Sequence, residues 1–204
     1  MCPAKDYSHL DLDNLREVDY TTLLVSLAKY KFVKSILSGN ESLLDIGCGT
    51  GYGTFYLGEF CRDITGVDID PAQIEKANKT YKSKNILFEH LDILKNPEVI
   101  KNKDIITCFE VIQDMSREKS FEFLKTINDH KDTDAVLFLS TPRRLPEDLL
   151  TPNRLKYHLH EYAYDELYED LNKVFKRVLI LGQLDEIIGS LHKNNVWTFY
   201  CICF

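Results

Sequence analysis

Leu43-Leu44-Asp45-Ile46-Gly47-Cys48-Gly49-Thr50-Gly51-Tyr52-Gly53 is the stretch that decides the fold of this chain. An apolar strand ends there in four glycines at alternate positions. Glycine takes positive φ and leaves room for a ligand against the peptide groups, so a strand that opens through such a turn into a helix predicts a site for a nucleotide-like molecule. Asp45, just before the first glycine, would repel a pyrophosphate and attract a cationic group.

The spacing of the glycines argues against the two common phosphate-binding loops. A dinucleotide fingerprint requires Gly-x-Gly-x-x-Gly, and in the two possible registers the third glycine position is Tyr52 or Thr54. A P-loop requires Gly-Lys-Ser/Thr after the glycines, which this chain lacks. The turn is therefore expected to bind a nucleoside with a cationic portion.

Two further strand ends carry carboxylates. Asp68 follows Ile64-Thr65-Gly66-Val67 and is expected to accept hydrogen bonds from both hydroxyls of a ribose, because the carboxyl ends of neighbouring strands meet at one crevice. Asp70 precedes Pro71 and is typical of a helix N-cap. Asp92 ends a third apolar segment, where it could accept from an adenine amino group.

These segments, with Phe109-Glu110-Val111-Ile112 and Ser140-Thr141-Pro142, resemble the ordered motifs of class I S-adenosylmethionine-dependent methyltransferases along nearly the whole chain. The chain is also similar to a subgroup that acts on small molecules and surface glycans. That subgroup has a basic-aromatic pair in the first helix, Gly-Tyr-Gly after the cofactor loop and a later His-x-x-Glu-aromatic, here Lys29-Tyr30, Gly51-Tyr52-Gly53 and His158 to Tyr162.

One motif departs from the subgroup. Relatives often have Glu-Val-Ile-Glu-His after the fourth strand, whereas this chain has Glu110-Val111-Ile112-Gln113-Asp114. Metal binding proposed for some relatives would need the second Glu and the His. Two carboxylates, Glu110 and Asp114, do not replace that set, and no Cys/His spacing suggests zinc, so we predict no metal.

The resemblance implies a set of site residues. Glu110 is expected to orient the acceptor or the cofactor amino group, and His158 to act as base or acceptor ligand with support from Glu161. The rival interpretation is structural: Glu110 is a solvated strand end, while the segment 158–162 caps a helix beginning near Tyr164 and packs Tyr162 onto the core. The residues expected to bind S-adenosylmethionine are Tyr30, Asp45, Gly47, Cys48, Gly49, Gly51, Tyr52, Asp68, Ile69, Asp92, Ile93 and Phe109.

Alternating strand and helix patterns predict an α/β fold with a mostly parallel sheet covered on both faces. The resemblance makes this the Rossmann-like class I methyltransferase fold, with seven strands and an antiparallel C-terminal strand. We expect one domain over 1–204, with a helical lead-in at 1–39 and an irregular substrate lid at 141–162 that follows the fifth strand. Strands are predicted near 43–47, 64–69, 86–91, 104–110, 134–140, 175–182 and 196–203, with helices after the first, second, fourth and fifth.

The composition limits the classes of substrate and the cellular location that the sequence predicts. A formal net charge of −7 disfavours a nucleic-acid substrate, because phosphate binding requires a basic face. The basic residues Arg143, Arg144, Arg154 and Lys156 could instead meet a small anionic or sugar-nucleotide-like acceptor. None of the six cysteines forms a Cys-x-x-Cys pair, and they are interpreted as reduced thiols. Residues 1–20 are mostly polar and no apolar run has membrane-spanning length, so we expect a cytoplasmic protein without stable membrane insertion.

The function that this sequence predicts is S-adenosylmethionine-dependent methylation of a small hydroxylated metabolite or a sugar precursor of a surface polysaccharide. An oxygen acceptor needs a base, for which histidine is suited by its reference pKa of about 6.5. An amine acceptor would not need one, so N-methylation of a small amine or amino sugar is an alternative. A nicotinamide-dependent oxidoreductase and a non-catalytic S-adenosylmethionine-binding partner subunit are alternatives of other classes.

Overall fold

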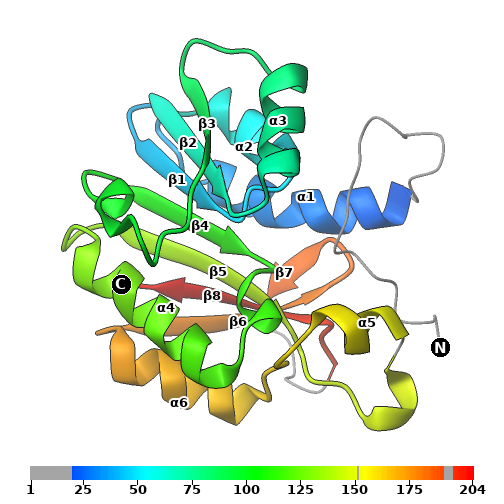
Figure 1. Cartoon of the computed structure of the whole chain (residues 1–204). Helices are drawn as coiled ribbons and strands as arrows, with labels where there is room; N and C mark the ends of the chain where they lie inside the picture. The colour runs from blue at the N-terminus through cyan, green and yellow to red at the C-terminus, as the bar shows by residue number, and fades with distance from the viewer. Residues whose placement is uncertain (1–19, 151, 191–194) are drawn as a thin grey trace.

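The computed structural model describes residues 20–150, 152–190 and 195–204. The part of the expected lead-in before residue 20 lies outside these described residues. A twisted sheet forms the middle layer, with α1, α2 and α3 covering one face and α4 and α6 the other (Figure 1). The α/β class and the two covered faces agree with the sequence prediction.

The sheet has eight strands in the order β3-β2-β1-β4-β5-β8-β6-β7. The first five in this order pair in parallel, whereas β8 runs antiparallel to both β5 and β6, as expected of the C-terminal strands. The expected count of seven was wrong by one short strand, β7, which pairs with β6 after a turn that puts Asp185 at φ 51°. The strands are β1 Ser42–Ile46, β2 Asp63–Asp68, β3 Ile86–His90, β4 Ile105–Phe109, β5 Val136–Pro142, β6 Val178–Leu184, β7 Ile187–Gly189 and β8 Thr198–Cys203.

Two of the helices, α3 and α4, begin at a residue whose side chain caps the helix. Asp70 accepts from the backbone N–H of Ala72 with Pro71 at the first helical position, so the predicted N-cap of α3 is confirmed. Ser116 caps α4 in the same way. The helices are α1 Tyr20–Lys34, α2 Tyr52–Gly58, α3 Pro71–Thr80, α4 Arg117–His130, α5 Pro152–Tyr157 and α6 Tyr164–Val174, with 3₁₀ turns η2 Pro97–Ile100, η3 Ile112–Asp114 and η4 Glu147–Leu149.

The buried core lies on both faces of the sheet because successive residues of a strand point to opposite sides. Along β5, Leu137 and Leu139 pack with residues of α4 and α6, whereas Phe138 packs with residues of α1 and α2. All three side chains are buried. This packing fixes the strand ends from which the site residues emerge.

The segment 141–162 is less regular than the rest, as predicted, but its first two residues belong to β5 and it contains η4 and α5. It is tied to the sheet by a bridge between Arg143 and Tyr162. Tyr162 is fully buried in the core. The predicted lid is therefore anchored at both ends, beside the carboxyl end of β5.

The cysteines and the length of the helices also bear on the sequence predictions. Cys48, Cys61, Cys108, Cys201 and Cys203 are buried free thiols, while Cys2 lies outside the described residues. Among the helices that the structure describes, none combines the length and apolar character needed to cross a membrane.

Candidate active site

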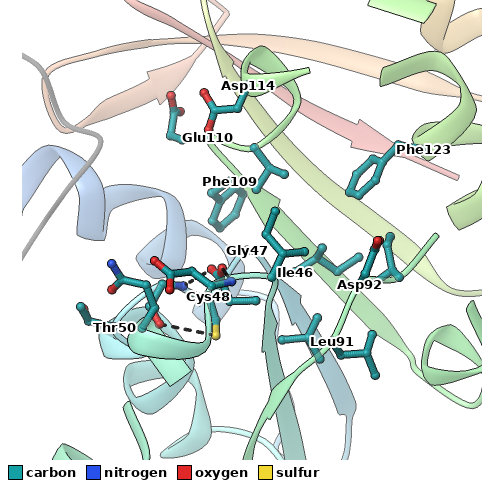
Figure 2. A pocket seen from close by; sticks show the side chains of 18 of the residues that line it. Ile46, Gly47, Cys48, Thr50, Leu91, Asp92, Phe109, Glu110, Asp114 and Phe123 are labelled. Atoms are coloured by element: carbon teal, nitrogen blue, oxygen red, sulfur yellow. Dashed lines mark hydrogen bonds between the residues drawn. The ribbon is translucent and has the colours of Figure 1, made fainter. Parts of the chain in front are cut away.

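A cavity of about 670 Å³ lies at the carboxyl ends of the parallel strands. Figure 2 shows Glu110 and Asp114 together at one end, with Phe109 between them and the glycine turn. The lining includes ten of the twelve residues predicted to bind the cofactor, and Glu110 as well. These ten are Tyr30, Gly47, Cys48, Gly49, Tyr52, Asp68, Ile69, Asp92, Ile93 and Phe109.

The glycine turn leaves one wall of the cavity without side chains. Gly49 has φ +54°, and a Cβ built there would meet nothing within 4 Å. A side chain would therefore enter the space that a ligand can use. Gly47 has φ +73° and faces the other way, because its Cβ would come within 2.3 Å of the Val111 Cγ2 atom. Gly49 thus keeps the cavity open, and Gly47 permits close packing against Val111.

Asp68 joins the turn to the cavity. Its Oδ2 accepts a hydrogen bond from the backbone N–H of Gly49 and its Oδ1 from that of Asp70, each at 2.9 Å. A carboxylate offers about four lone-pair positions, so each oxygen retains the capacity to accept a further bond. The carboxylate is thus fixed in orientation and still able to accept from two ligand hydroxyls.

The wall beyond Asp68 combines apolar surface with a carboxylate. Ile69 is 71% exposed although it is apolar, and it lines the cavity with the buried Ile93. The Asp92 Oδ1 atom accepts from the backbone N–H of Leu94, and its Oδ2 atom lies 3.2 Å from Lys95 Nζ. This arrangement suits a flat aromatic ring with an amino group at its edge.

Asp45 is one of the two predicted cofactor-binding residues that do not line the cavity. The carboxylate is fully buried beneath the turn, where it accepts from the hydroxyls of Thr54 and Thr107 at 2.6 and 2.7 Å. Burial raises the pKa of this carboxyl to about 6, although both hydroxyl bonds act to lower it. Asp45 therefore supports the turn from behind.

Gly51 is the other predicted cofactor-binding residue outside the cavity lining. It is the N-cap of α2 at φ +84°, and a Cβ there would come within 2.6 Å of the Phe88 ring. The position requires glycine for backbone conformation and packing, while the cavity lining does not include it.

Glu110 is held by two donors from different elements. Lys29 Nζ on α1 donates to its Oε1 at 2.9 Å, and Ser140 Oγ at the end of β5 donates to the same oxygen at 2.7 Å. Burial acts to raise the pKa of the Glu110 carboxyl, but Lys29, Ser140 and the nearby His158 outweigh it, so the pKa is lowered. The backbone at Glu110 has φ 57°, a strained conformation for a residue with a side chain.

His158 and Glu161 form a buried pair in the lid. The His158 Nδ1 atom lies 2.6 Å from Glu161 Oε1, and Arg154 Nε donates to that same oxygen at 2.8 Å. Burial acts to raise the pKa of the Glu161 carboxyl, but these two bonds lower it overall. Neither His158 nor Glu161 lines the cavity itself.

The rival structural interpretation of this segment is confirmed only for Tyr162. The N-terminus of α6 is capped by Glu166, whose carboxylate accepts from the backbone N–H of Ala163 at 3.1 Å. His160 lies 3.9 Å from Glu166 and its pKa is lowered by burial and by Arg144. His158 and Glu161 therefore remain available for a role other than capping.

Sequence reasoning missed several supporting residues. Lys29 was noted only as half of a basic-aromatic pair, and Ser140 only as part of a motif. Thr54 and Thr107, which hold Asp45, carried no signal, because hydroxyl residues are common in such elements. Among the described residues, no group of three or more His, Cys, Asp or Glu side chains is arranged to hold a metal ion.

Comparison with known proteins adds a family match. Residues 43–131 match the family model described as "Methyltransferase domain". Over 158 residues the chain is 25% identical to "Probable S-adenosyl-L-methionine-dependent methyltransferase TehB" of Haemophilus influenzae, covering 75% of this chain and 51% of that protein. Over 160 residues it is 26% identical to the "Small RNA 2'-O-methyltransferase" of Arabidopsis thaliana, covering 67% of this chain and 17% of that protein.

A solved structure shows the same fold. The methyltransferase domain of a bacterial Hen1 protein superposes with a TM-score of 0.69 at 20% identity, covering 88% of this chain and 98% of that domain. The chain therefore has a Rossmann-like methyltransferase fold. It spans about half or less of the two curated relatives described above.

Proposed function

We propose that this chain, whose residues 43–131 match a methyltransferase domain, is a class I S-adenosylmethionine-dependent methyltransferase that transfers a methyl group to a hydroxyl of a small acceptor. The observation that carries this proposal is the buried His158–Glu161 pair, in which His158 Nδ1 lies 2.6 Å from Glu161 Oε1. A base is needed for a hydroxyl acceptor and is dispensable for an amine. We further propose a sugar or sugar-containing metabolite as the acceptor.

The residues of the cavity fit the cofactor. Gly49 leaves open backbone where a ligand can lie, Asp68 presents two oriented oxygens to ribose hydroxyls, and Asp92 with Ile69 suits adenine. Phe109 and Tyr30, whose rings meet edge to face with centroids 5.0 Å apart, close the end towards Glu110. When bound there, S-adenosylmethionine supplies an already activated methyl group.

His158 takes the proton in the proposed reaction. Its Nδ1 faces an anionic acceptor, Glu161, so the neutral ring carries its hydrogen on Nδ1 and leaves Nε2 with a lone pair. As the acceptor hydroxyl is methylated, its proton would pass to Nε2 of His158, which the Glu161 carboxylate orients through Nδ1. Arg154 holds Glu161 in place, and Glu110 orients the acceptor.

The basic cluster of the lid gives little support for an anionic acceptor. Arg143 Nε donates to the backbone of Val196, and Arg144 lies 2.6 Å from Glu166. Arg154 is buried against Glu161. These guanidinium groups are engaged within the protein, and the cavity lining combines the carboxylates of Asp68, Asp92 and Glu110 with the amines of Lys29, Lys76 and Lys119. A neutral, hydroxyl-rich acceptor agrees better with this charge distribution.

A second candidate substrate is the 2'-hydroxyl of a small RNA. It is favoured by the name of the Arabidopsis relative, which matches 67% of this chain. It is disfavoured by the net charge of −7, because counterion release on phosphate binding requires Lys and Arg. The reacting group would still be a sugar hydroxyl, so the roles proposed for His158 and Glu110 would be unchanged.

The test has a binding step and a turnover step. Calorimetry with S-adenosylmethionine should give saturable binding, and NAD should give none. Release of S-adenosylhomocysteine is then measured with sugars, sugar nucleotides, amines and short RNA as acceptors. A protein that binds S-adenosylmethionine but turns over no acceptor would support the non-catalytic partner, and turnover of amines alone would support N-methylation.

His158→Ala tests the proposed base. Turnover should fall by roughly 10²–10⁴-fold, the usual contribution of general base catalysis, with S-adenosylmethionine affinity unchanged. His130→Ala is the matched control, because His130 lies in the last turn of α4 with its Nδ1 2.9 Å from the Thr126 carbonyl oxygen. A loss of activity that only follows the loss of folded protein would remove His158 from the mechanism.

A further inference from the structure

We propose that Lys29 is a positioning residue that fixes Glu110 as an anionic hydrogen-bond acceptor and so makes the site select acceptors that offer a hydrogen-bond donor at this point. This inference rests on the proposed function and adds a selection rule to it. A hydroxyl or an amine meets the rule, while a phosphate or carboxylate group at the same point does not.

The burial of Lys29 is the first observation. The residue is 4% exposed on α1, and lysine is almost never fully buried unless it is paired. Its partner is Glu110, 81 positions away in the sequence, at a distance of 2.9 Å between Nζ and Oε1. Both residues line the cavity. The pair therefore joins the first helix to the end of β4 beside the proposed acceptor.

The second observation is the unequal use of the two Glu110 oxygens. Lys29 and Ser140 both donate to Oε1. From the described part of the chain no donor reaches Oε2, and the side chain is 23% exposed towards the cavity. The strained φ of 57° is maintained by this packing. One oxygen is thus fixed within the protein, and the other is presented to a ligand.

The charges around Glu110 determine its ionisation. Lys29 from α1 acts to lower the pKa of the Glu110 carboxyl, and His158 does so only in its protonated form, while Asp114 from η3 lines the same cavity. Tyr52 from α2 is half-buried, and desolvation raises the pKa of its hydroxyl, so it stays neutral. An ionised carboxylate has no proton to donate and can only accept. Lys29 is the buried cation in contact with it, so loss of Lys29 should allow Glu110 to be protonated and to donate.

The direct test is a carboxyl titration by ¹³C NMR on protein labelled at glutamate, with Glu110→Gln to identify the resonance. In Lys29→Met the titration midpoint of Glu110 should rise by at least about one pH unit, the lower end of the effect of an opposite charge at this distance. Lys29→Arg should restore the wild-type midpoint. Lys31→Met is the control, because Lys31 is exposed on the same helix. An unchanged midpoint in Lys29→Met would overturn the proposal.

Lys29→Met leaves a buried charge without its partner and could fail to fold. The double variant Lys29→Met with Glu110→Gln removes both charges. Its urea midpoint should recover most of the loss seen in Lys29→Met. A double variant that is no more stable than Lys29→Met would show that the two side chains are not coupled and would also overturn the proposal.

Calorimetry separates this inference from the proposed function. S-adenosylmethionine affinity should change less than about twofold in Lys29→Met, while KM for the acceptor found in the screen should rise. A loss of cofactor affinity greater than tenfold would assign Lys29 to the cofactor and refute its role towards the acceptor. If the wild-type protein did not bind S-adenosylmethionine, the proposed function would fail, and the titration would still decide whether Lys29 controls Glu110.

Discussion

Replacement of Asp68 by alanine should weaken S-adenosylmethionine binding by about 1.5–3 kcal/mol, the range for hydrogen bonds to a charged group. This corresponds to roughly a 10- to 150-fold increase in Kd. The reason is that both oxygens of Asp68 are oriented towards the cavity by the backbone N–H groups of Gly49 and Asp70, at 2.9 Å each. The same variant frees these two N–H groups, which can reach water, so the loss of folding stability should be only about 1–2 kcal/mol.

The assay is calorimetry with S-adenosylmethionine, accompanied by urea unfolding of each variant. Asp68→Asn retains one carbonyl acceptor without the charge and should give an intermediate Kd. Ser116→Ala is the control: Ser116 caps α4 and lies outside the cavity lining, so its loss should cost about 1 kcal/mol of stability with little change in Kd. If Asp68→Ala bound the cofactor within twofold of wild type with its fold intact, the assignment of the ribose position would be wrong.

Two further predictions concern the glycine turn and acid stability. Gly47→Ala should lower the free energy of unfolding by about 1–3 kcal/mol in urea, because its Cβ would overlap Val111 at positive φ, whereas Gly49→Ala should stay closer to wild type in stability and lose cofactor affinity. Equal losses of unfolding free energy in Gly47→Ala and Gly49→Ala would contradict the different roles assigned to the two glycines. Burial acts to raise the pKa of Glu41, but hydrogen bonds from Ser38 and neighbouring backbone lower it to about 2, so its stabilising effect is complete above about pH 4.5 and is lost as the pH falls towards 2. Glu41→Gln should therefore reduce the fall in the free energy of unfolding between pH 5 and pH 2.5. An unchanged fall would refute the stabilising role of the Glu41 carboxylate.

The part of the site that is local in sequence was predictable. The glycine turn and the acidic ends of β2 and β3 lie within short segments whose spacing carries the information, and the structure brings them to one cavity. The full burial of Asp45 could not be predicted, because depth beneath a turn depends on partners from other elements, here the hydroxyls of Thr54 and Thr107. The pairing of Lys29 with Glu110 spans 81 positions and leaves no periodic pattern.

The fold, too, was predictable where the signal is local in sequence, and less so where it depends on contacts between elements. Strand alternation and glycine signals identified the parallel half and the antiparallel end of the sheet. The short strand β7 escaped because Ile187–Gly189 is too short for a period-two pattern, and it is defined only by its pairing with β6. The helix beginning at Tyr164 was expected, but its cap comes from Glu166, one turn into the helix, instead of the preceding histidines.

The position of β8 between β5 and β6 has a consequence for the order in which the protein assembles. During synthesis β6 emerges before β8, yet β6 is joined to the parallel half of the sheet only through β8. The segment 141–162 also becomes fully bonded only after β8 has been synthesised, because the backbone N–H of Arg143 donates to the carbonyl of Trp197, just before β8. The half that contains the glycine turn can pair its strands earlier, so a nascent chain should acquire its nucleoside cavity before it acquires an ordered acceptor side.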